Sequence, residues 1–268
     1  MKNQILEKLK KLHQKTKNKL FFNFVLSKVH DSIQIKGQIY QADQFEIFSA
    51  LIQASADVNS KNDHGETPLF FVESKEMAEL LIQAGADVNV RNKYGETPLF
   101  KVKSKKIAEF LIQHGADINA RDHFDATPLF FAQSKEMAEM LIQHGADVNA
   151  QDKQENTPLH WAENQEIVKL LIQYGANVNT KNKHGETPLH LYHGPNSHQE
   201  IVKLLIQHGA DISVQNNDGQ TAAEFQRFYG RPDLADFLEQ KAIEFEQKKL
   251  NHNLSNAKKI SNKLKNHL

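Results

Sequence analysis

The chain has 268 residues, of which 39% are hydrophobic and 25% are charged, and this composition is typical of a soluble, foldable protein. It contains no cysteine, which excludes disulfide bonds, cysteine-ligated metal sites and thiol nucleophiles. The net charge of zero conceals three segments: residues 1–36 carry +7, residues 37–240 carry −12 and residues 241–268 carry +5. This segregation predicts an acidic body with a basic segment at each end.

The N-terminal segment, residues 1–36, is predicted to form a basic amphipathic helix, because apolar residues recur at helical spacing within it (Ile5, Leu6, Leu9, Leu12). The most apolar run, residues 20–26, is interrupted by Asn23 and is far shorter than the ~18 residues that a membrane-spanning helix needs. No small-residue cleavage site follows it. We therefore expect neither a membrane anchor nor a secretory signal peptide here.

The middle of the chain consists of repeats. Thr-Pro-Leu begins at Thr67 and recurs every thirty residues through Thr187, and Leu-Ile-Gln recurs in the same register from Leu51 to Leu171. In each copy the Thr can cap a short helix that begins at Pro, a Ser or Asn can cap a second, amphipathic helix, and a Gly can end that helix. An Asn/Asp-rich turn follows. Each copy therefore predicts a helix–turn–helix–β-turn unit.

The fourth copy carries a family signature, Thr157-Pro158-Leu159-His160-Trp161-Ala162. It matches the T-P-L-H-x-A motif, and over roughly residues 40–240 the chain resembles ankyrin-repeat proteins. Ankyrin repeats usually have ~33 residues, whereas these have thirty, and the missing residues fall within the first helix, which we expect to be short. The resemblance implies an all-α ankyrin-repeat solenoid with helical N- and C-terminal extensions.

On this basis the chain divides into three parts. The basic helical extension at 1–36 precedes an ankyrin-repeat domain at 37–240, and a basic polar tail occupies 241–268. Within the domain we expect a half-repeat cap, five full repeats and a closing cap, at residues 37–60, 61–90, 91–120, 121–150, 151–180, 181–214 and 215–240. An insertion at 193–196 predicts a protruding loop in the fifth repeat. Asp125 and Glu155 replace the glycine of the other hairpin tips, so we expect these two tips to differ in shape or to be looser.

The positions that vary between copies are the candidate binding residues. One such position lies two residues after each Thr-Pro-Leu, and the resemblance implies that it faces a concave groove together with the hairpin tips. Because aromatic residues are enriched at interface hot spots, we predict partner binding by the row Phe71, Lys101, Phe131, Trp161 and Leu191 and by the tips His64, Tyr94, Phe124, Gln154 and His184. The alternative is that Phe70 with Phe71, and Phe130 with Phe131, turn inward and fill the core beside the shortened helix.

The fourteen histidines raise the question of a metal site. The densest group is His184, His190, His193 and His198, but its His-x-x-His lacks a cysteine or a definite carboxylate partner, and the resemblance implies that His190 hydrogen-bonds the backbone. No phosphate-binding loop, dinucleotide-binding, nucleophile-elbow or zinc-protease motif occurs. We therefore predict no metal, no cofactor, no catalytic residue and no enzymatic activity.

The sequence thus predicts a non-enzymatic, monomeric module that binds an unidentified protein and no small-molecule substrate. The alternative is a binder of anionic surfaces, membrane or nucleic acid, through residues 1–36 and 241–268. We favour the protein partner, because the tail has too few aromatic residues to stack on bases. The lysine- and asparagine-rich composition resembles that of ankyrin proteins of intracellular bacteria, some of them delivered into host cells. We therefore expect a cytoplasmic location or export into a host cell.

Overall fold

A computed structural model describes residues 33–35, 38–40, 44–53, 56–192 and 197–265. The predicted helix in residues 1–32 and the predicted loop at 193–196 lie outside these ranges. The chain forms two compact units, unit 1 (residues 1–150) and unit 2 (residues 151–268). Each unit is described by itself.

The described part of unit 1 begins with a short antiparallel pair of strands, β1 (Ile33–Ile35) and β2 (Gln38–Tyr40), in which Ile33 lies opposite Tyr40. The N-terminal helix was predicted to include residues 33–36. This prediction is wrong for residues 33–35, which form strand β1. Two β-branched isoleucines alternate there with Gln34, a pattern that favours a strand. The next element, helix α3 (Gln44–Gln53), lies within the predicted half-repeat cap at 37–60.

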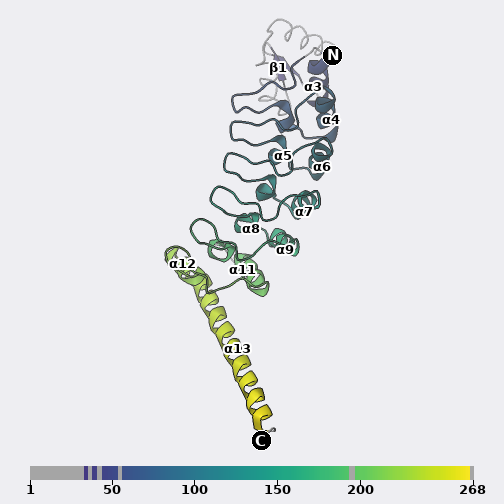
Figure 1. Cartoon of the computed structure of the whole chain (residues 1–268). Helices are drawn as coiled ribbons and strands as arrows, with labels where there is room; N and C mark the ends of the chain where they lie inside the picture. The colour runs from purple at the N-terminus through teal and green to yellow at the C-terminus, as the bar shows by residue number, and fades with distance from the viewer. Residues whose placement is uncertain (1–32, 36–37, 41–43, 54–55, 193–196, 266–268) are drawn as a thin grey trace. The chain divides into compact units, whose positions relative to one another are not determined.

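Three repeats follow in unit 1, and each pairs a short helix with a longer one. In chain order the elements are η1 (Pro68–Phe71), α4 (Lys75–Gln83), α5 (Pro98–Lys101), α6 (Lys105–Gln113), η2 (Pro128–Phe131) and α7 (Lys135–Gln143). The short helices have four residues and the longer ones nine, which confirms the shortened first helix. In Figure 1 the hairpin loops of these repeats project from one side, and the longer helices line the other.

The predicted N-caps of the longer helices are confirmed at Ser74 and Ser134, whose Oγ atoms accept hydrogen bonds from Met77 N (3.1 Å) and Met137 N (3.2 Å). The prediction is wrong for the side chain of Ser104, which makes no capping bond among the described residues. Its backbone has ψ near 120°, against 155° at Ser74, so the chain enters α6 differently.

A ladder of asparagine side chains joins successive repeats of unit 1. Asn89 Nδ2 donates to the carbonyl oxygen of Gly115 (2.8 Å), and Asn89 Oδ1 accepts from the backbone N–H of Asp117 (2.8 Å). Asn59 and Asn119 make the same two bonds one repeat earlier and one repeat later. The recurring Asp-x-Asn pattern therefore provides a side-chain hydrogen-bond connection between neighbouring repeats.

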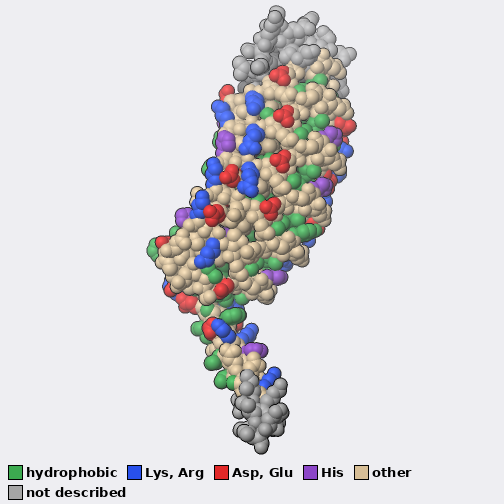
Figure 2. Space-filling view, in the orientation of Figure 1, with side chains coloured by type: hydrophobic (Ala, Val, Ile, Leu, Met, Phe, Trp, Pro, Cys, Tyr) green, Lys and Arg blue, Asp and Glu red, His purple; other side chains and the backbone are tan. Residues whose placement is uncertain are grey.

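Cationic side chains add a second connection on the surface. Lys61 Nζ donates to the carbonyl oxygen of Arg91 (3.1 Å), and the Arg91 guanidinium donates to the carbonyl oxygen of Arg121. Over the repeats of unit 1, Figure 2 shows a column of Lys and Arg side chains beside a column of Asp and Glu side chains. This face therefore carries both signs of charge, as is usual for a surface in contact with water.

Unit 2 continues the same pattern and ends in a long helix. Its elements are α8 (Pro158–Trp161), α9 (Gln165–Gln173), α10 (Pro188–Leu191), α11 (Ser197–Gln207), α12 (Ala222–Phe228) and α13 (Pro232–Lys265). The start of α13 packs against α12 and buries Ala235 and Leu238. The predicted C-terminal extension is therefore helical, and its apolar side chains Phe245, Leu250 and Leu254 are exposed.

The hairpin tips require a positive φ, as the glycines there indicate. Gly95 has φ 79°, and Asp125 and Glu155 adopt φ 61° at the matching position. The turn bond is also kept, with 3.1 Å from Asp125 N to Asp122 O, against 3.0 Å from Gly95 N to Asn92 O. The turn hydrogen bond therefore does not show the difference in shape that we expected between the tips. Asp125 and Glu155 adopt a backbone conformation that is unfavourable for residues other than glycine.

Substitution of Gly95 should be more damaging than substitution of another glycine with a similar φ. A Cβ atom on Gly95 would lie 2.8 Å from the backbone nitrogen of His123 in the next tip, whereas one on Gly115 (φ 88°) would meet no described atom within 4 Å. We expect Gly115→Ala to lower the free energy of unfolding by about 1 kcal/mol and Gly95→Ala by about 2 kcal/mol or more. Urea unfolding measures both, and equal losses would contradict the packing argument.

Candidate partner-binding surface

Each hairpin tip of unit 1 is held by one Asn or Asp side chain. Asn62 Oδ1 accepts hydrogen bonds from the backbone N–H groups of His64 and Glu66 (both 2.9 Å), and Asn62 Nδ2 donates to Glu66 Oε2 (3.0 Å). Asn92 makes the corresponding three bonds in the second repeat. Asp122 keeps the two bonds to backbone N–H groups in the third. The side chain fixes the turn, and the tip residue is therefore held in one place.

The tips of successive repeats are hydrogen-bonded to one another. The backbone N–H of Lys93 donates to the carbonyl oxygen of His64, and that of His123 donates to the carbonyl oxygen of Tyr94, both at 2.8 Å. The rings of His64 and Tyr94 are stacked, with centroids 6.5 Å apart. Tyr94 and Phe124 are 52% and 68% exposed. Unit 1 thus presents aromatic tip residues to solvent on a fixed backbone.

The row position after each Thr-Pro-Leu is exposed in all three repeats of unit 1. Phe71 is 38% and Phe131 47% exposed, and Lys101 is exposed at the same position between them. The preceding residue, Phe70, is buried. The inward-turned alternative therefore holds for Phe70 and is wrong for Phe71 and Phe131. Phe131 still touches its neighbour Phe100 with ring centroids 5.7 Å apart, which keeps it beside the adjacent repeat.

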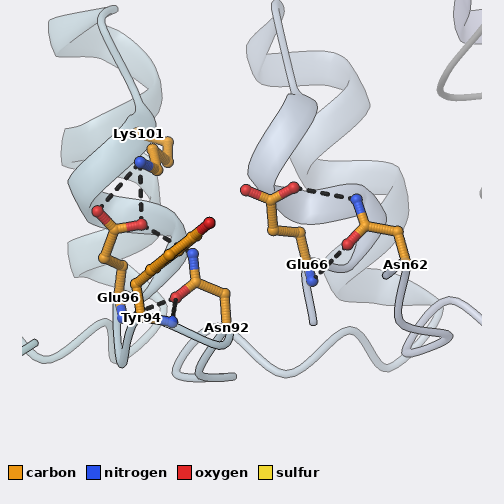
Figure 3. A network of polar contacts seen from close by, with 6 residues as sticks. All are labelled: Asn62, Glu66, Asn92, Tyr94, Glu96 and Lys101. Carbon is orange, nitrogen blue, oxygen red and sulfur yellow. Dashed lines mark hydrogen bonds and ion pairs between the residues drawn. The ribbon is translucent and has the colours of Figure 1, made fainter. Parts of the chain in front are cut away.

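One ion pair lies within this surface. Lys101 Nζ is 3.0 Å and 2.9 Å from the two carboxylate oxygens of Glu96, and Asn92 Nδ2 also donates to that carboxylate. Figure 3 shows this group beside the equivalent Asn62–Glu66 pair of the first repeat. The lysine of the row is thus bound to the base of its own hairpin.

In unit 2 the row and tip residues are also at the surface. Trp161 is 60% exposed, Leu191 is half-buried, and the tip residues Gln154 and His184 are exposed. The tips are joined as in unit 1, with Lys183 N donating to the carbonyl oxygen of Gln154 (2.9 Å). The structure therefore places all ten predicted residues within reach of solvent, and their role in binding stays a prediction.

Two histidines of unit 2 are buried at the position that phenylalanine occupies in unit 1. His160 Nδ1 lies 3.0 Å from the Thr157 N–H and 2.9 Å from Thr157 Oγ1, and Nε2 faces the carbonyl oxygen of Glu186 in the next repeat. His190 repeats this arrangement with Thr187 and Gln220. The backbone role that the resemblance implied for His190 is confirmed.

Burial lowers the pKa of His160 to about 4, and a hydrogen bond to the Glu186 carbonyl and the charge of Asp152 oppose that change only in part. Desolvation likewise lowers the pKa of His190. Because Nδ1 accepts the Thr157 N–H bond, His160 is held as the neutral tautomer with its proton on Nε2. A proton added at Nδ1 would face that N–H group, so the site favours neutral imidazole.

Phenylalanine at this position leaves the corresponding threonine hydroxyls without partners. Within the described part of unit 1, Thr67, Thr97 and Thr127 have buried Oγ1 atoms that make no hydrogen bond. The expectation that Thr67 caps its helix through the side chain is therefore wrong. Thr67 does occupy the N-cap position. Its hydroxyl has no imidazole beside it, whereas the hydroxyls of Thr157 and Thr187 are hydrogen-bonded to His160 and His190.

The metal hypothesis receives no support from the described residues. Among them, no three His, Asp or Glu side chains are placed to hold an ion. Of the four histidines in the densest group, His193 and the side chain of His198 lie outside the described set.

None of the helices in the described ranges is long and apolar enough to cross a membrane.

A buried glutamine that the sequence did not point to joins α12 to the preceding repeat of unit 2. Gln226 on α12 is fully buried, and its Nε2 donates to the carbonyl oxygens of His190 (2.6 Å) and Tyr192 (3.1 Å). Its Oε1 accepts from Arg231 Nη1 (3.0 Å). The available signal was a polar residue directly after Phe225 within the predicted closing cap at 215–240.

The family model described as ankyrin repeats (3 copies) matches residues 38–122, 101–182 and 163–249. No curated protein matches the chain significantly. Together the three matches span residues 38–249, which is more than half of the 268 residues.

Proposed function

Because the chain belongs to the ankyrin-repeat family, we propose that it binds a partner protein through the row and tip residues of its repeats, without catalysis. Ankyrin repeats generally mediate protein–protein interactions and are typically non-enzymatic. The resemblance to ankyrin proteins of intracellular bacteria extends the proposal to a bacterial protein that acts on host proteins.

The observation that carries this proposal is the exposure of the aromatic row. Phe71, Phe131 and Trp161 lie two residues after leucines that are buried, yet their rings remain exposed. Full burial of a side chain of this size is worth about 1.5–3 kcal/mol, and covering the exposed part of these rings contributes a fraction of that value. Phe71 and Phe131, together with Tyr94 and Phe124, offer apolar area in unit 1, and Trp161 does so in unit 2. Aromatic anchors of this kind dominate binding energies.

Replacement of the aromatic row should abolish partner capture. We expect the full chain to retain a discrete protein from a cell lysate, and a Phe71→Ala, Phe131→Ala, Trp161→Ala variant to lose it, because the anchors are gone. The control is a Phe228→Ala, Phe245→Ala, Leu254→Ala variant, which removes three other exposed apolar side chains and should keep the partner. Circular dichroism establishes that both variants are folded.

The opposite pattern would contradict the proposal. If the variant with the three row substitutions keeps every captured partner, the aromatic row does not contribute to partner binding. If binding instead falls steeply with salt and depends on residues 1–36 and 241–268, the chain binds anionic surfaces through its basic segments.

A further inference from the structure

We propose that the partner segment held by unit 1 is cationic and that one of its lysine or arginine side chains binds the Glu66 carboxylate beside Phe71. This inference rests on the proposed function, since it specifies the chemistry of the partner that the same surface takes. It follows from a comparison of the first two repeats, which have the same hairpin and differ at the row position.

In the second repeat a lysine already occupies the carboxylate. Lys101 Nζ lies 3.0 Å and 2.9 Å from the two oxygens of Glu96, and the side chain of Glu96 is only 13% exposed. An ammonium group that approaches from the row position therefore reaches both oxygens. The Lys101–Glu96 ion pair is therefore an example, within this chain, of how a cation binds at the base of a hairpin.

In the first repeat the equivalent carboxylate, Glu66, has no cationic partner among the described residues. Glu66 is held like Glu96, with Asn62 Nδ2 donating to Oε2 (3.0 Å), but Phe71 stands where Lys101 stands in the second repeat. Within the described part of the chain, no Lys, Arg or His side chain forms an ion pair with Glu66. Figure 3 shows the two pairs together, with the lysine on Glu96 alone.

The surroundings of Glu66 favour an organic cation. Glu66 is half-buried, so its charge is screened less than that of a fully exposed carboxylate. Phe71 and the stacked rings of His64 and Tyr94 are exposed in the same repeats and can cover the methylene groups of a lysine or the plane of a guanidinium. A metal ion would need several carboxylates, and none of the described groups provides three ligands.

The charge of the whole repeat region points the same way. Residues 37–240 carry −12, so a basic segment that lies against the repeats meets an excess of negative charge, although the basic residues of 1–36 and 241–268 bring the whole chain to zero. The local charge favours a basic partner, and Glu66 then positions one of its side chains beside the aromatic row.

The test uses the full chain and a dye-labelled, end-capped decapeptide of alternating lysine and glycine as the probe, with binding followed by fluorescence anisotropy at 50 and 150 mM salt. We expect Glu66→Gln, which removes only the charge, to weaken binding about tenfold. The matched control Glu79→Gln removes an equal charge from α4, where Glu79 is exposed and bonded to Gln83 (3.4 Å), and should change the affinity less than about twofold.

Two exchanges between the repeats test the geometry. Phe71→Lys supplies Glu66 with an internal ammonium, as in the second repeat, and should weaken probe binding as Glu66→Gln does. Lys101→Phe frees Glu96 and should strengthen binding. No binding by the wild type, equal effects of Glu66→Gln and Glu79→Gln, or no gain from a folded Lys101→Phe variant would each overturn the inference.

Failure of this inference is distinguishable from failure of the proposed function. If the aromatic row variant loses its captured protein while Glu66→Gln keeps it at full affinity, the surface binds a partner whose chemistry is not cationic. If Glu66→Gln loses the captured protein as well, both proposals are supported.

Discussion

Lowering the pH from 8 to 5 is expected to reduce the free energy of unfolding of the wild type by about 2 kcal/mol more than that of a His160→Phe variant. The folded chain binds a proton at His160 with a pKa of about 4, against 6.5 for an unperturbed histidine. Between these values the unfolded state binds more protons, so stability rises with pH in this window and falls as the pH drops through it. Below about pH 4 the loss from this one residue reaches about 3 kcal/mol.

Phenylalanine is a fitting replacement because the chain itself uses it at the matching positions of unit 1, in Phe70, Phe100 and Phe130. At pH 8 the variant should be the less stable protein, since the Thr157 N–H and Oγ1 lose their shared bonds to Nδ1. The difference in the free energy of unfolding between the wild type and His160→Phe should narrow as the pH falls. Urea unfolding between pH 4 and 8 measures it, and parallel stability curves for the two proteins would show that His160 is not buried as a neutral group.

The reciprocal substitution, histidine for phenylalanine, tests the same effect at the equivalent position of another repeat. Phe100→His places an imidazole next to Thr97, whose buried Oγ1 otherwise makes no bond among the described residues. This variant should gain the acid sensitivity that His160→Phe loses. The Thr-Pro-Leu-Phe and Thr-Pro-Leu-His forms of the repeat therefore differ in how the buried threonine is satisfied and in how stability depends on pH.

Much of the fold was predictable because its determinants are local. The Pro at each helix start, the serine caps at Ser74 and Ser134 and the turn residues act within one thirty-residue copy, and a repeated pattern makes each of them easier to recognise. The surface position of Phe71 was left open, because an aromatic pair such as Phe70–Phe71 follows neither helical nor strand periodicity over four residues. Burial of the first ring and exposure of the second depend on the packing of neighbouring repeats.

Interactions between copies were the part that sequence could not supply. The recurrence of Asn89 and its equivalents did not reveal their role, because the bonds of Asn89 to Gly115 and Asp117 appear only when the next repeat is in place. The cation position on Glu96 lies within one copy and was missed for another reason, since Lys101 is five residues away across the start of α5, which is not a helical i,i+3 or i,i+4 spacing. The strands β1 and β2 were missed because each has only three residues, which is too short for a reliable pattern.

The second large effect is expected at Gln226, which joins the closing helices α12 and α13 to the fifth repeat. Gln226→Leu keeps the approximate volume and removes both donors to the carbonyl oxygens of His190 and Tyr192. Two buried acceptors then lose their partner, together with the bond from Arg231. We expect the free energy of unfolding to fall by about 3 kcal/mol, since each buried unpaired group costs about 1–3 kcal/mol.

The neighbouring residue provides the contrast. Arg227 forms ion pairs with Asp236 (2.7 Å) and Glu239 (2.8 Å), but all three side chains are exposed, so Arg227→Ala should change stability little. In a repeat protein each unit is stabilised mainly by its neighbours, and the loss at Gln226 should therefore be local. Hydrogen exchange should show faster exchange of the α12 amides in Gln226→Leu, with α9 unaffected. Uniform acceleration across unit 2, or equal effects of the two substitutions, would contradict the assignment of Gln226 as the bond between the last two repeats.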